Sequence, residues 1–413
     1  MNDRLSVGIE TNCVAPLNLE QMSLRLFTWI GVDSFFLPDH YLSFVPRSAW
    51  GPTITPAAKV IPSPDAFFDP FVMMGMMAAR YRRVRIGTGV TEPFRRHPAT
   101  LAQAFVTVDH LTKGRAVLGI GNGERENTEP YGIPFTRRVG RLEEALHIIR
   151  TLWQSRGEPV TLEGRTWSLK RALFTTPLYK DKAPAIWMAA HAPRMLSLTG
   201  RYADGWYPTH KMTPTEYREK LGAIHAAAAE AGRRLDHFEP AVQIQLVLGP
   251  DRRTALERLV KVRTVGAMSL ALPGYLWDRH GLRHPLGKDY EGFPQFVPEE
   301  LTAEQVDTAC RSVTPELMGD AVFAGNADEI VAEAKKLVEA GLRHLVIWNV
   351  GPLASGASAA DLVKLAVLVR RLRKLPLPPR SAVIDVRAAH PARPAVRGQQ
   401  AGAEREAAAG GTS

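Results

Sequence analysis

Cysteine and long apolar runs are both scarce in this sequence. The two cysteines in 413 residues, Cys13 and Cys310, lie too far apart to form a metal-binding motif or a disulfide framework. The most apolar stretch, residues 66–79, is too short to span a bilayer and is interrupted by Asp69 and Pro70. The first residues, MNDRLSVGIE, hold no apolar signal core. We therefore expect a globular protein of a reducing cytoplasm.

Acidic residues are fewer than basic ones, 42 against 52, so the formal net charge is +10. The Lys and Arg residues are scattered, whereas nucleic-acid binding needs a basic patch combined with aromatic or helical readout. We therefore expect no nucleic-acid partner. A positive field instead favours an anionic small ligand, such as a cofactor that carries phosphate or carboxylate groups.

Short apolar strands alternate with amphipathic helices along most of the chain. Eight strands that alternate with helices predict an α/β protein built as a closed parallel (β/α)8 TIM barrel rather than as two domains. The strands are expected at residues 5–9, 34–37, 84–90, 115–120, 185–189, 205–208, 241–248 and 343–348. The helices are expected at residues 19–30, 70–80, 98–111, 139–153, 193–202, 214–231, 252–265, 328–340 and 360–373.

The barrel is expected to form one domain, residues 1–375, with two insertions. Residues 43–66 are rich in proline and irregular, and residues 272–320 form a second, longer insertion. The segment 376–413 is rich in Pro, Ala, Gly and Arg and lacks apolar periodicity. Such a composition cannot bury a core, so we expect a disordered C-terminal tail.

The segment LTKGRAVLGIGNGERENTE, residues 111–129, combines a strand with a glycine-rich loop and carboxylates. Gly119, Gly121 and Gly123 are two residues apart, so backbone amides can approach a bulky anionic ligand without side chains in the way. A nicotinamide-binding Rossmann turn would need a helix directly after the glycines. Pro130 and Pro134 prevent that helix, so the loop indicates a different kind of site.

Polar side chains stand at three neighbouring strand ends, where a barrel enzyme places its chemistry. The second strand ends in Asp39 and His40, the third in Gly-Thr-Gly-Val, and the fourth in a loop with Asn122, Glu124 and Asn127. An imidazole and a carboxylate from adjacent strands supply a proton donor and acceptor. The alternatives are structural: Asp39 and His40 would cap and hydrogen-bond the strand end, and Glu124 would form a structural salt bridge.

Four further groups of residues have both a functional and a structural interpretation. His191 either contacts a ligand or caps the following helix, and the Thr-His-Lys at 209–211 is either a phosphate clamp or a solvated loop. His280 and His284 have metal-like spacing but no evident carboxylate or cysteine partner, so no metal site is predicted. The Phe and Met residues of segment 67–77 are either core or the lining of an apolar groove.

These motifs together resemble the luciferase-like flavin and deazaflavin oxidoreductases. The resemblance covers residues 5–373, and within that family the phthiodiolone/phenolphthiodiolone dimycocerosate ketoreductases are the most similar group. It is carried by DH at 39–40, IGTGV at 86–90, RRHPATLAQAFVTVDHLTKGRAVLGIGNGE at 95–124 and AGNADEIVAEAKKLVEAGLRHLVIWNVGP at 324–352. The segments YLSFVPRS, AAKVIPSPDAFFDP, WMAAHAPRMLSLTGRYADGW and WDRHGLRHPLG carry the closer likeness.

The resemblance implies a barrel that binds reduced coenzyme F420, with a cis peptide bond between Gly89 and Val90. It places Glu124 near the reacting carbon of the deazaflavin. The cofactor-binding residues that it implies are Asp39, Gly89, Val90, Asn122, Asn127, His191, Ala192 and Thr209. Sugar-phosphate dehydrogenases of the family have Trp where this chain has Phe44, and a glycine pair at 191–192, which argues against a sugar phosphate.

We therefore expect an F420-dependent oxidoreductase that transfers hydride to a ketone of a lipid or polyketide-like molecule. His40 would be the proton donor, oriented by Asp39 and assisted by Glu124, or His40 and Glu124 would exchange these roles. The alternatives are an FMN-dependent monooxygenase, an F420-dependent methylene-pterin reductase, and a non-catalytic cofactor-binding or membrane-surface protein. A homodimer is expected, and peripheral contact with a membrane is left open.

Overall fold

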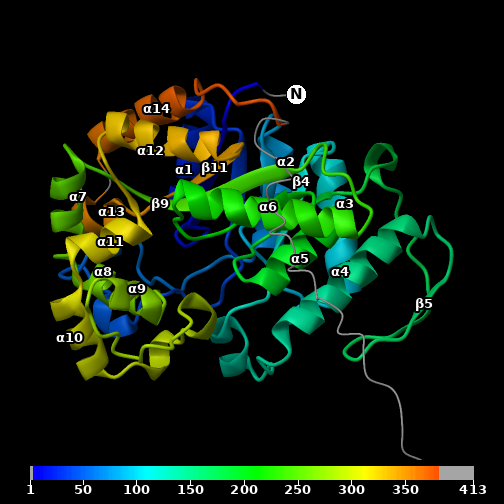
Figure 1. The fold of residues 1–413 in the computed structure, drawn as a ribbon, viewed down its shortest axis with the longest axis horizontal. Coiled ribbons are helices and arrows are strands. Elements are labelled where there is room, and N and C mark those ends of the chain that lie inside the picture. Colours follow the sequence, from blue (N-terminus) through cyan, green and yellow to red (C-terminus); the bar gives the residue numbers. More distant parts are fainter. Residues whose placement is uncertain (1–2, 357, 381–413) are drawn as a thin grey trace, which may run out of the picture.

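Eight parallel strands form the closed barrel that the sequence predicts (Figure 1). The structure is a computed structural model that describes residues 3–356 and 358–380. β9 pairs with both β8 and β11, and these pairings close the ring. The barrel strands are β1 (Ser6–Glu10), β2 (Ser34–Leu37), β3 (Arg85–Thr88), β4 (Ala116–Ile120), β7 (Ala185–Met188), β8 (Gly205–Trp206), β9 (Glu239–Leu248) and β11 (His344–Asn349).

Amphipathic helices surround the strands, and their ends follow known capping rules. Proline occupies the first turn of several helices, and α6 and α12 each begin with a capping box, Thr213 with Glu216 and Asn326 with Glu329. The outer helices are α1 (Leu17–Ile30), α2 (Pro70–Arg80), α3 (Pro98–Thr112), α4 (Arg138–Gln154), α5 (Pro193–Tyr202), α6 (Pro214–Glu230), α7 (Arg252–Leu259), α12 (Ala327–Glu339) and α14 (Ala359–Leu372).

The buried apolar residues form three clusters: one inside the barrel, one between the strands and the helices, and one between the two insertions. Phe36, Trp187 and Tyr207 are among the side chains that fill the barrel interior, and a larger apolar layer lies between the strands and the helices. A separate apolar cluster joins the two insertions, with Trp277 and Phe296 at its centre. Figure 1 shows the helices of the second insertion gathered on the opposite side from β5.

The second insertion is more regular than the sequence indicates. It contains α9 (Gly274–Arg279), α10 (Ala303–Ser312) and α11 (Pro315–Ala321). The predicted helix 252–265 is divided into α7 and α8 (Arg263–Met268), and the buried hydroxyl of Thr264 at the start of α8 donates to Ala49 O at 2.6 Å. Contact with the first insertion therefore redirects the chain.

Four short elements were not predicted. An antiparallel hairpin follows α4, β10 extends the sheet beside the end of β9, and a helical turn follows β11. Strands of three or four residues carry too little alternation to be recognised in a sequence. These elements are β5 (Val160–Leu162), β6 (Leu169–Ala172), β10 (Phe323–Gly325) and α13 (Pro352–Ser355).

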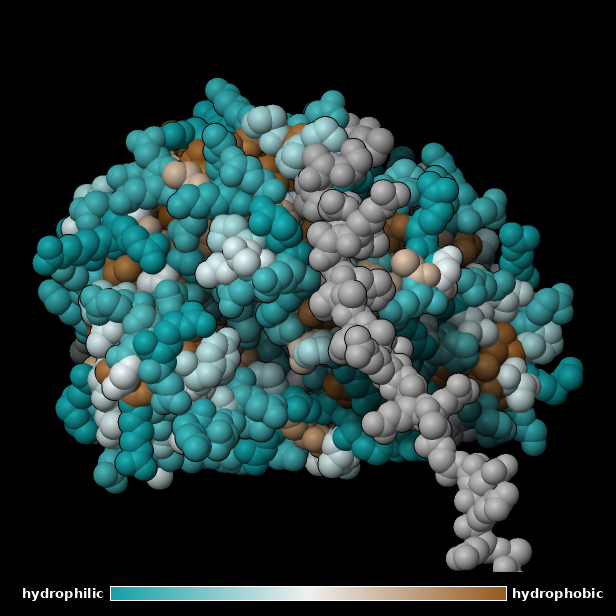
Figure 2. Space-filling model, viewed as in Figure 1, coloured by the Kyte–Doolittle hydropathy of each residue, from teal (hydrophilic) through white to brown (hydrophobic). Residues whose placement is uncertain are grey.

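The predicted tail, residues 376–413, lies outside the described residues from 381 onward. Its described part, 376–380, lies against the barrel, where the Leu377 N–H donates to Asp3 O at 3.1 Å and Arg343 donates to Pro378 O. None of the described helices is long and apolar enough to cross a membrane. The face in Figure 2 is mainly hydrophilic, with scattered apolar side chains.

Close contact between β3 and β4 leads to the first prediction. A Cβ atom on Gly119 would lie 1.8 Å from the backbone oxygen of Thr88, so Gly119→Ala must push the two strands apart. We expect the variant to lose about 3 kcal/mol or more of stability, seen as a lower melting temperature. Gly222→Ala in α6 is the control, because its Cβ meets no atom within 4 Å and alanine favours helix. An unchanged melting temperature for Gly119→Ala would contradict the packing of these strands.

Candidate active site

A cavity of about 860 Å³ opens at the carboxyl ends of the barrel strands. Its wall includes loops after most of the strands, together with parts of both insertions. All of the site residues predicted from the sequence lie on this wall: Asp39, His40, Gly89, Val90, Asn122, Glu124, Asn127, His191, Ala192 and Thr209. The topology therefore brings residues that are up to 170 positions apart in the chain to one place.

The glycine-rich loop after β4 begins with little side-chain bulk. A Cβ on Gly121 would lie 3.1 Å from Val90 Cγ2 and 3.6 Å from Ala189 Cβ, so only small groups line this part of the wall. Gly123 has φ of +73°, a left-handed conformation that favours glycine. The peptide bond between Gly89 and Val90 is cis, as the resemblance implies. These small residues leave room for a flat ring against the backbone.

Asn127 connects the loop after β4 to the loop after β2. It lies in a single 3-10 turn, Arg125–Asn127, that directly follows Glu124. Its carbonyl oxygen accepts the N–H groups of Tyr41 at 2.7 Å and Leu42 at 3.4 Å. Its amide nitrogen lies 3.0 Å from His40 Nδ1 and 3.4 Å from Glu124 Oε2. One side chain thus fixes the imidazole relative to the carboxylate.

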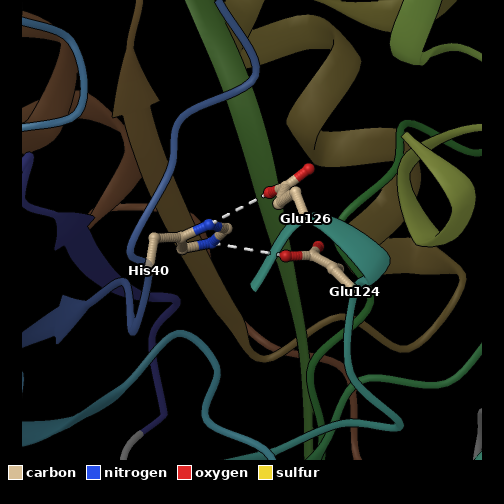
Figure 3. A group of neighbouring side chains, drawn as sticks. All are labelled: His40, Glu124 and Glu126. Atoms are coloured by element: carbon tan, nitrogen blue, oxygen red, sulfur yellow. Dashed lines mark ion pairs between the residues drawn. The ribbon is translucent and has the colours of Figure 1, made fainter. Parts of the chain in front are cut away.

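His40 stands between two carboxyl groups (Figure 3). Its Nε2 lies 3.5 Å from Glu124 Oε2, and its Nδ1 lies 3.3 Å from Glu126 Oε1. Nδ1 also lies 3.2 Å from Leu42 O. Glu124 lines the cavity with 31% of its side chain exposed, whereas the Glu126 side chain is fully buried. Glu126 was not predicted from the sequence, because nothing in a Glu-Arg-Glu run shows in which direction the second glutamate side chain points.

Asp39 has a different role from the one expected. Its carboxylate accepts from Thr91 Oγ1 at 2.6 Å and forms ion pairs with Arg95 and Arg96. Arg95 also pairs with the buried Glu92 and donates to Asp39 O. The contacts that orient the His40 ring come from Asn127 and Leu42, so the expected orientation of His40 by Asp39 is not the arrangement seen.

Burial makes the groups around His40 neutral rather than charged. Burial, and then Arg95, lower the pKa of His40 to about 4. Burial raises the pKa of Glu124 to about 7, although Arg95 opposes the change. Burial, and then Glu124, raise the pKa of Glu126 well above its usual value. At neutral pH the imidazole is therefore uncharged, Glu124 is about half protonated, and the protonated form of Glu126 is favoured.

A second polar group lies deeper in the barrel, and the sequence analysis missed it. Glu10 ends β1, lines the cavity and accepts a hydrogen bond from Tyr207 Oη at 2.9 Å. Burial raises the pKa of Glu10 to about 8. Gln243 and Thr11 also line the cavity, and Gln243 Oε1 and Thr11 Oγ1 are buried without a hydrogen-bond partner in the described part of the chain. Glu10 stands at a strand end, so the rule that found Asp39 could have found it.

The opposite wall carries stacked rings. His191 stacks on His210 with ring centroids 4.5 Å apart, and His210 stacks on Phe293 of the second insertion at 5.3 Å. His191 Nε2 accepts the backbone N–H of Thr209 at 3.3 Å. Lys211 does not complete a phosphate clamp, because it pairs with Glu333 at 2.7 Å and donates to two backbone carbonyls. The phosphate-clamp interpretation of Lys211 is therefore wrong.

The mouth of the cavity is apolar where the two insertions meet. Phe44 packs edge-on against Phe293 at 4.6 Å, and His40 packs against Phe44 and Phe67. Trp50 also lines this lobe. From the Phe and Met residues of segment 67–77, Phe67 alone lines the cavity, whereas Met73, Met74 and Met77 are buried in the core. Those methionines are therefore core residues rather than a groove.

The histidines of the second insertion have local partners. His280 Nε2 lies 3.1 Å from Asp320 Oδ2, and His284 packs between Trp277 and Tyr290. Within residues 3–356 and 358–380, neither histidine belongs to a group of three side chains that could hold a metal ion. Their spacing reflects local packing.

Comparisons with known proteins agree with this geometry. The family described as luciferase-like monooxygenase matches residues 21–344. A phthiodiolone/phenolphthiodiolone dimycocerosates ketoreductase of Mycobacterium kansasii is 42% identical over 86% of this chain and 98% of the relative. An F420-dependent glucose-6-phosphate dehydrogenase of Microbacterium testaceum (strain StLB037) is 30% identical over 78% of this chain and 84% of the relative. A solved F420-dependent secondary alcohol dehydrogenase in complex with an F420-acetone adduct is 21% identical, with a TM-score of 0.69 over 90% of this chain and all of that chain, and shares the fold.

The ion cluster below the site leads to the second prediction. Arg95, Asp39 and Glu92 have side chains that are at most 5% exposed, so Arg95→Met leaves the buried Glu92 without its ion-pair partner and Asp39 with Arg96 alone. We expect a loss of about 3–5 kcal/mol in the free energy of unfolding, measured by urea denaturation. Arg253→Met removes an exposed ion pair with Glu257 and should leave the urea midpoint unchanged. Equal effects of the two substitutions would contradict a buried charged cluster.

Proposed function

This chain belongs to the luciferase-like monooxygenase family, and from that premise we propose that it is an F420-dependent oxidoreductase that reduces a ketone. The observation that carries the proposal is the His40–Glu124 pair on the wall of a cavity with a flat floor. The relatives named as a ketoreductase and as an F420-dependent dehydrogenase support both halves of the proposal. The cytoplasmic location and the homodimer stay predictions.

The residues of the cavity fit a deazaflavin with a phosphate-bearing side chain. Gly89, Val90 and Gly121 give a flat wall for the ring, and the unpartnered Gln243 Oε1 can accept from a ring N–H. No side chain caps α5 at Ala192, so the backbone N–H groups of its first turn are open to a phosphate beside Thr209. When bound, reduced F420 would supply the hydride to the carbonyl carbon.

The chain itself must then protonate the oxygen of the reduced carbonyl. A general acid works best when its pKa lies near the working pH. Glu124 meets this condition with a pKa of about 7, whereas the His40 pKa of about 4 leaves no imidazolium at neutral pH. We therefore assign the role of proton donor to Glu124, with His40 as its assisting neighbour. This is the alternative in which the two residues exchange the roles first expected from the sequence. Asn127 holds both groups in position.

The acceptor is proposed to be a ketone on a lipid or polyketide-like chain. The apolar lobe formed by Phe44, Phe67, Trp50 and Phe293 suits an alkyl chain beside the carbonyl. Lys211 is already engaged by Glu333, so it is not available to the phosphate group of a sugar phosphate. Burial of an alkyl chain contributes about 0.8 kcal/mol per CH2 group.

The third prediction tests the cofactor. In a fluorescence titration of the purified protein, we expect tight binding of F420 and feeble binding of FMN, with F420 binding weakened by salt because the ligand is anionic. Tight binding of FMN with oxygen uptake in the presence of reduced flavin would instead identify a monooxygenase. Tight binding of F420 without turnover of any carbonyl compound would identify a non-catalytic cofactor-binding protein.

The fourth prediction tests the proton donor. Glu124→Gln should lower kcat for ketone reduction by about 10²–10⁴-fold, because the amide has no proton to give. The wild-type kcat should fall as pH rises through about 7, where Glu124 loses its proton, and the variant should lack this limb. Glu129→Gln, a half-exposed carboxylate in the same loop, is the control. If Glu124→Gln keeps the wild-type kcat, Glu124 is not the proton donor, and that role belongs to His40.

A further inference from the structure

Glu126 is a buried carboxyl group that the proposed mechanism does not use. Its side chain is fully buried and is absent from the cavity wall, so its contact with the site passes through His40 Nδ1. Asn127 Nδ2 lies 3.3 Å from its Oε1, and its Oε2 has no hydrogen-bond partner among the residues that the structure describes. Such a group has no reason to be buried next to the imidazole for packing alone.

A metal ion is a poor explanation for this cluster. His40, Glu124 and Glu126 offer ligand atoms within 4.8 Å of one another. The two carboxyl groups, however, face opposite nitrogens of the same ring, so one ion cannot take both contacts through His40 (Figure 3). The amide nitrogen of Asn127 also lies 3.0 Å from His40 Nδ1, 3.4 Å from Glu124 Oε2 and 3.3 Å from Glu126 Oε1, and a hydrogen-bond donor at this place repels a cation.

We propose that Glu126 is the internal proton source of the site and reloads Glu124 through the imidazole of His40. Glu126 acts through another residue, so it is a positioning residue and not a catalytic one. The proposal rests on the proposed function for its final acceptor, the oxygen of the reduced ketone. Its geometric basis is the line Glu126 Oε1, His40 Nδ1, His40 Nε2 and Glu124 Oε2, with steps of 3.3 Å and 3.5 Å on either side of the ring. Hydrogen bonds of this kind are often long before the substrate binds.

The proton transfers balance without any further reactant. The Glu124 hydroxyl bond breaks as its proton joins the alkoxide oxygen, and the carboxylate left behind takes the proton from His40 Nε2. Nδ1 takes the proton of Glu126, whose hydroxyl electron pair stays on the carboxylate. The imidazole changes tautomer and gains no charge, which suits a buried histidine with a pKa of about 4. After the product leaves, a proton from solvent returns to Glu126 along the same path.

The surroundings of Glu126 favour the proton-bearing form. Burial raises its pKa, and so do Glu124 from its own loop and Asp65 from the first insertion, whereas Arg95 lowers it. The neighbouring group on the second insertion is Tyr290, whose pKa is raised by burial and then by Glu126, so it stays neutral. His40 is neutral as well. These surroundings favour the protonated form of Glu126, which loses its proton as pH rises above its raised pKa.

The fifth prediction uses nitrogen NMR of the His40 ring, which needs neither F420 nor a ketone. Glu124→Gln removes the other titrating neighbour, and His40→Gln assigns the signals. In Glu124→Gln, protonated Glu126 should donate to Nδ1 and keep the proton of the ring on Nε2. At higher pH the Glu126 carboxylate should accept from Nδ1–H, so the ring changes tautomer. In Glu124→Gln/Glu126→Gln the tautomer should not change with pH.

A pH-independent tautomer in Glu124→Gln would overturn the relay even if the protein proves to be an F420-dependent ketoreductase. If the wild-type enzyme reduces no ketone, the NMR result still decides whether Glu126 exchanges a proton with His40.

The second test of the relay measures kcat for ketone reduction. With a long-chain aliphatic methyl ketone as the probe, Glu126→Gln should lower kcat by about 10²-fold and leave F420 affinity and melting temperature unchanged. In the wild type, kcat should also decline at the high pH at which Glu126 loses its proton. Glu126→Gln should lack this decline. Glu126→Asp, which keeps the acid, should recover part of the rate.

Equal losses of kcat in Glu126→Gln and Glu126→Asp, with weaker F420 binding or a lower melting temperature, would show a structural role and overturn the proposal. A wild-type rate in Glu126→Gln would overturn it too.

Discussion

The side-chain amide of Asn127 is the contact on which the geometry of the site depends. Its oxygen receives two backbone N–H groups of the loop after β2, and its nitrogen reaches the imidazole and both carboxyl groups of the loop after β4. Two strand ends that the barrel places side by side are thereby held at one spacing. An amide can do this because it presents an acceptor and two donors from one planar group, which neither a carboxylate nor an ammonium can.

Two neighbouring clusters handle charge in opposite ways. Asp39 and Glu92 are compensated by Arg95 and Arg96, so they form an ionised cluster. His40, Glu124 and Glu126 form no ion pair with a Lys or Arg side chain in the described part of the chain, and burial shifts the pKa of each toward its neutral form. The ionised cluster fixes the backbone of the rim, while the neutral one is left free to exchange protons. This separation of similar carboxyl groups by their surroundings is how one site obtains both an anchor and an acid.

The sequence was most informative where a residue's position alone determines its direction. A residue at the end of a barrel strand faces the cavity, which is why Asp39, His40 and Glu124 could be predicted. Glu126 lies in a 3-10 turn, and the direction of its side chain depends on the turn that Gly123 and Asn127 impose. The partners of Asp39 could not be predicted either, because Arg95 and Arg96 reach it from a loop more than fifty residues away. The barrel was predicted correctly, whereas β5, β6 and β10 are too short to carry a pattern.

The two sides of the cavity are built from different parts of the chain, and this division explains how one barrel serves different substrates. One wall comes from Gly89, Gly121 and Ala189 at the strand ends, where a Cβ on Gly89 would lie only 3.0 Å from Phe36 Cβ and Tyr207 Oη inside the barrel. The apolar lobe comes from the two insertions, which share a separate apolar cluster around Trp277 and Phe296. Changes in that cluster alter the lobe and leave the strand ends in place. Under the proposed function, the cofactor ring would lie against the wall formed by the strand ends, and the lobe with Phe44 and Phe293 would receive the apolar part of the acceptor.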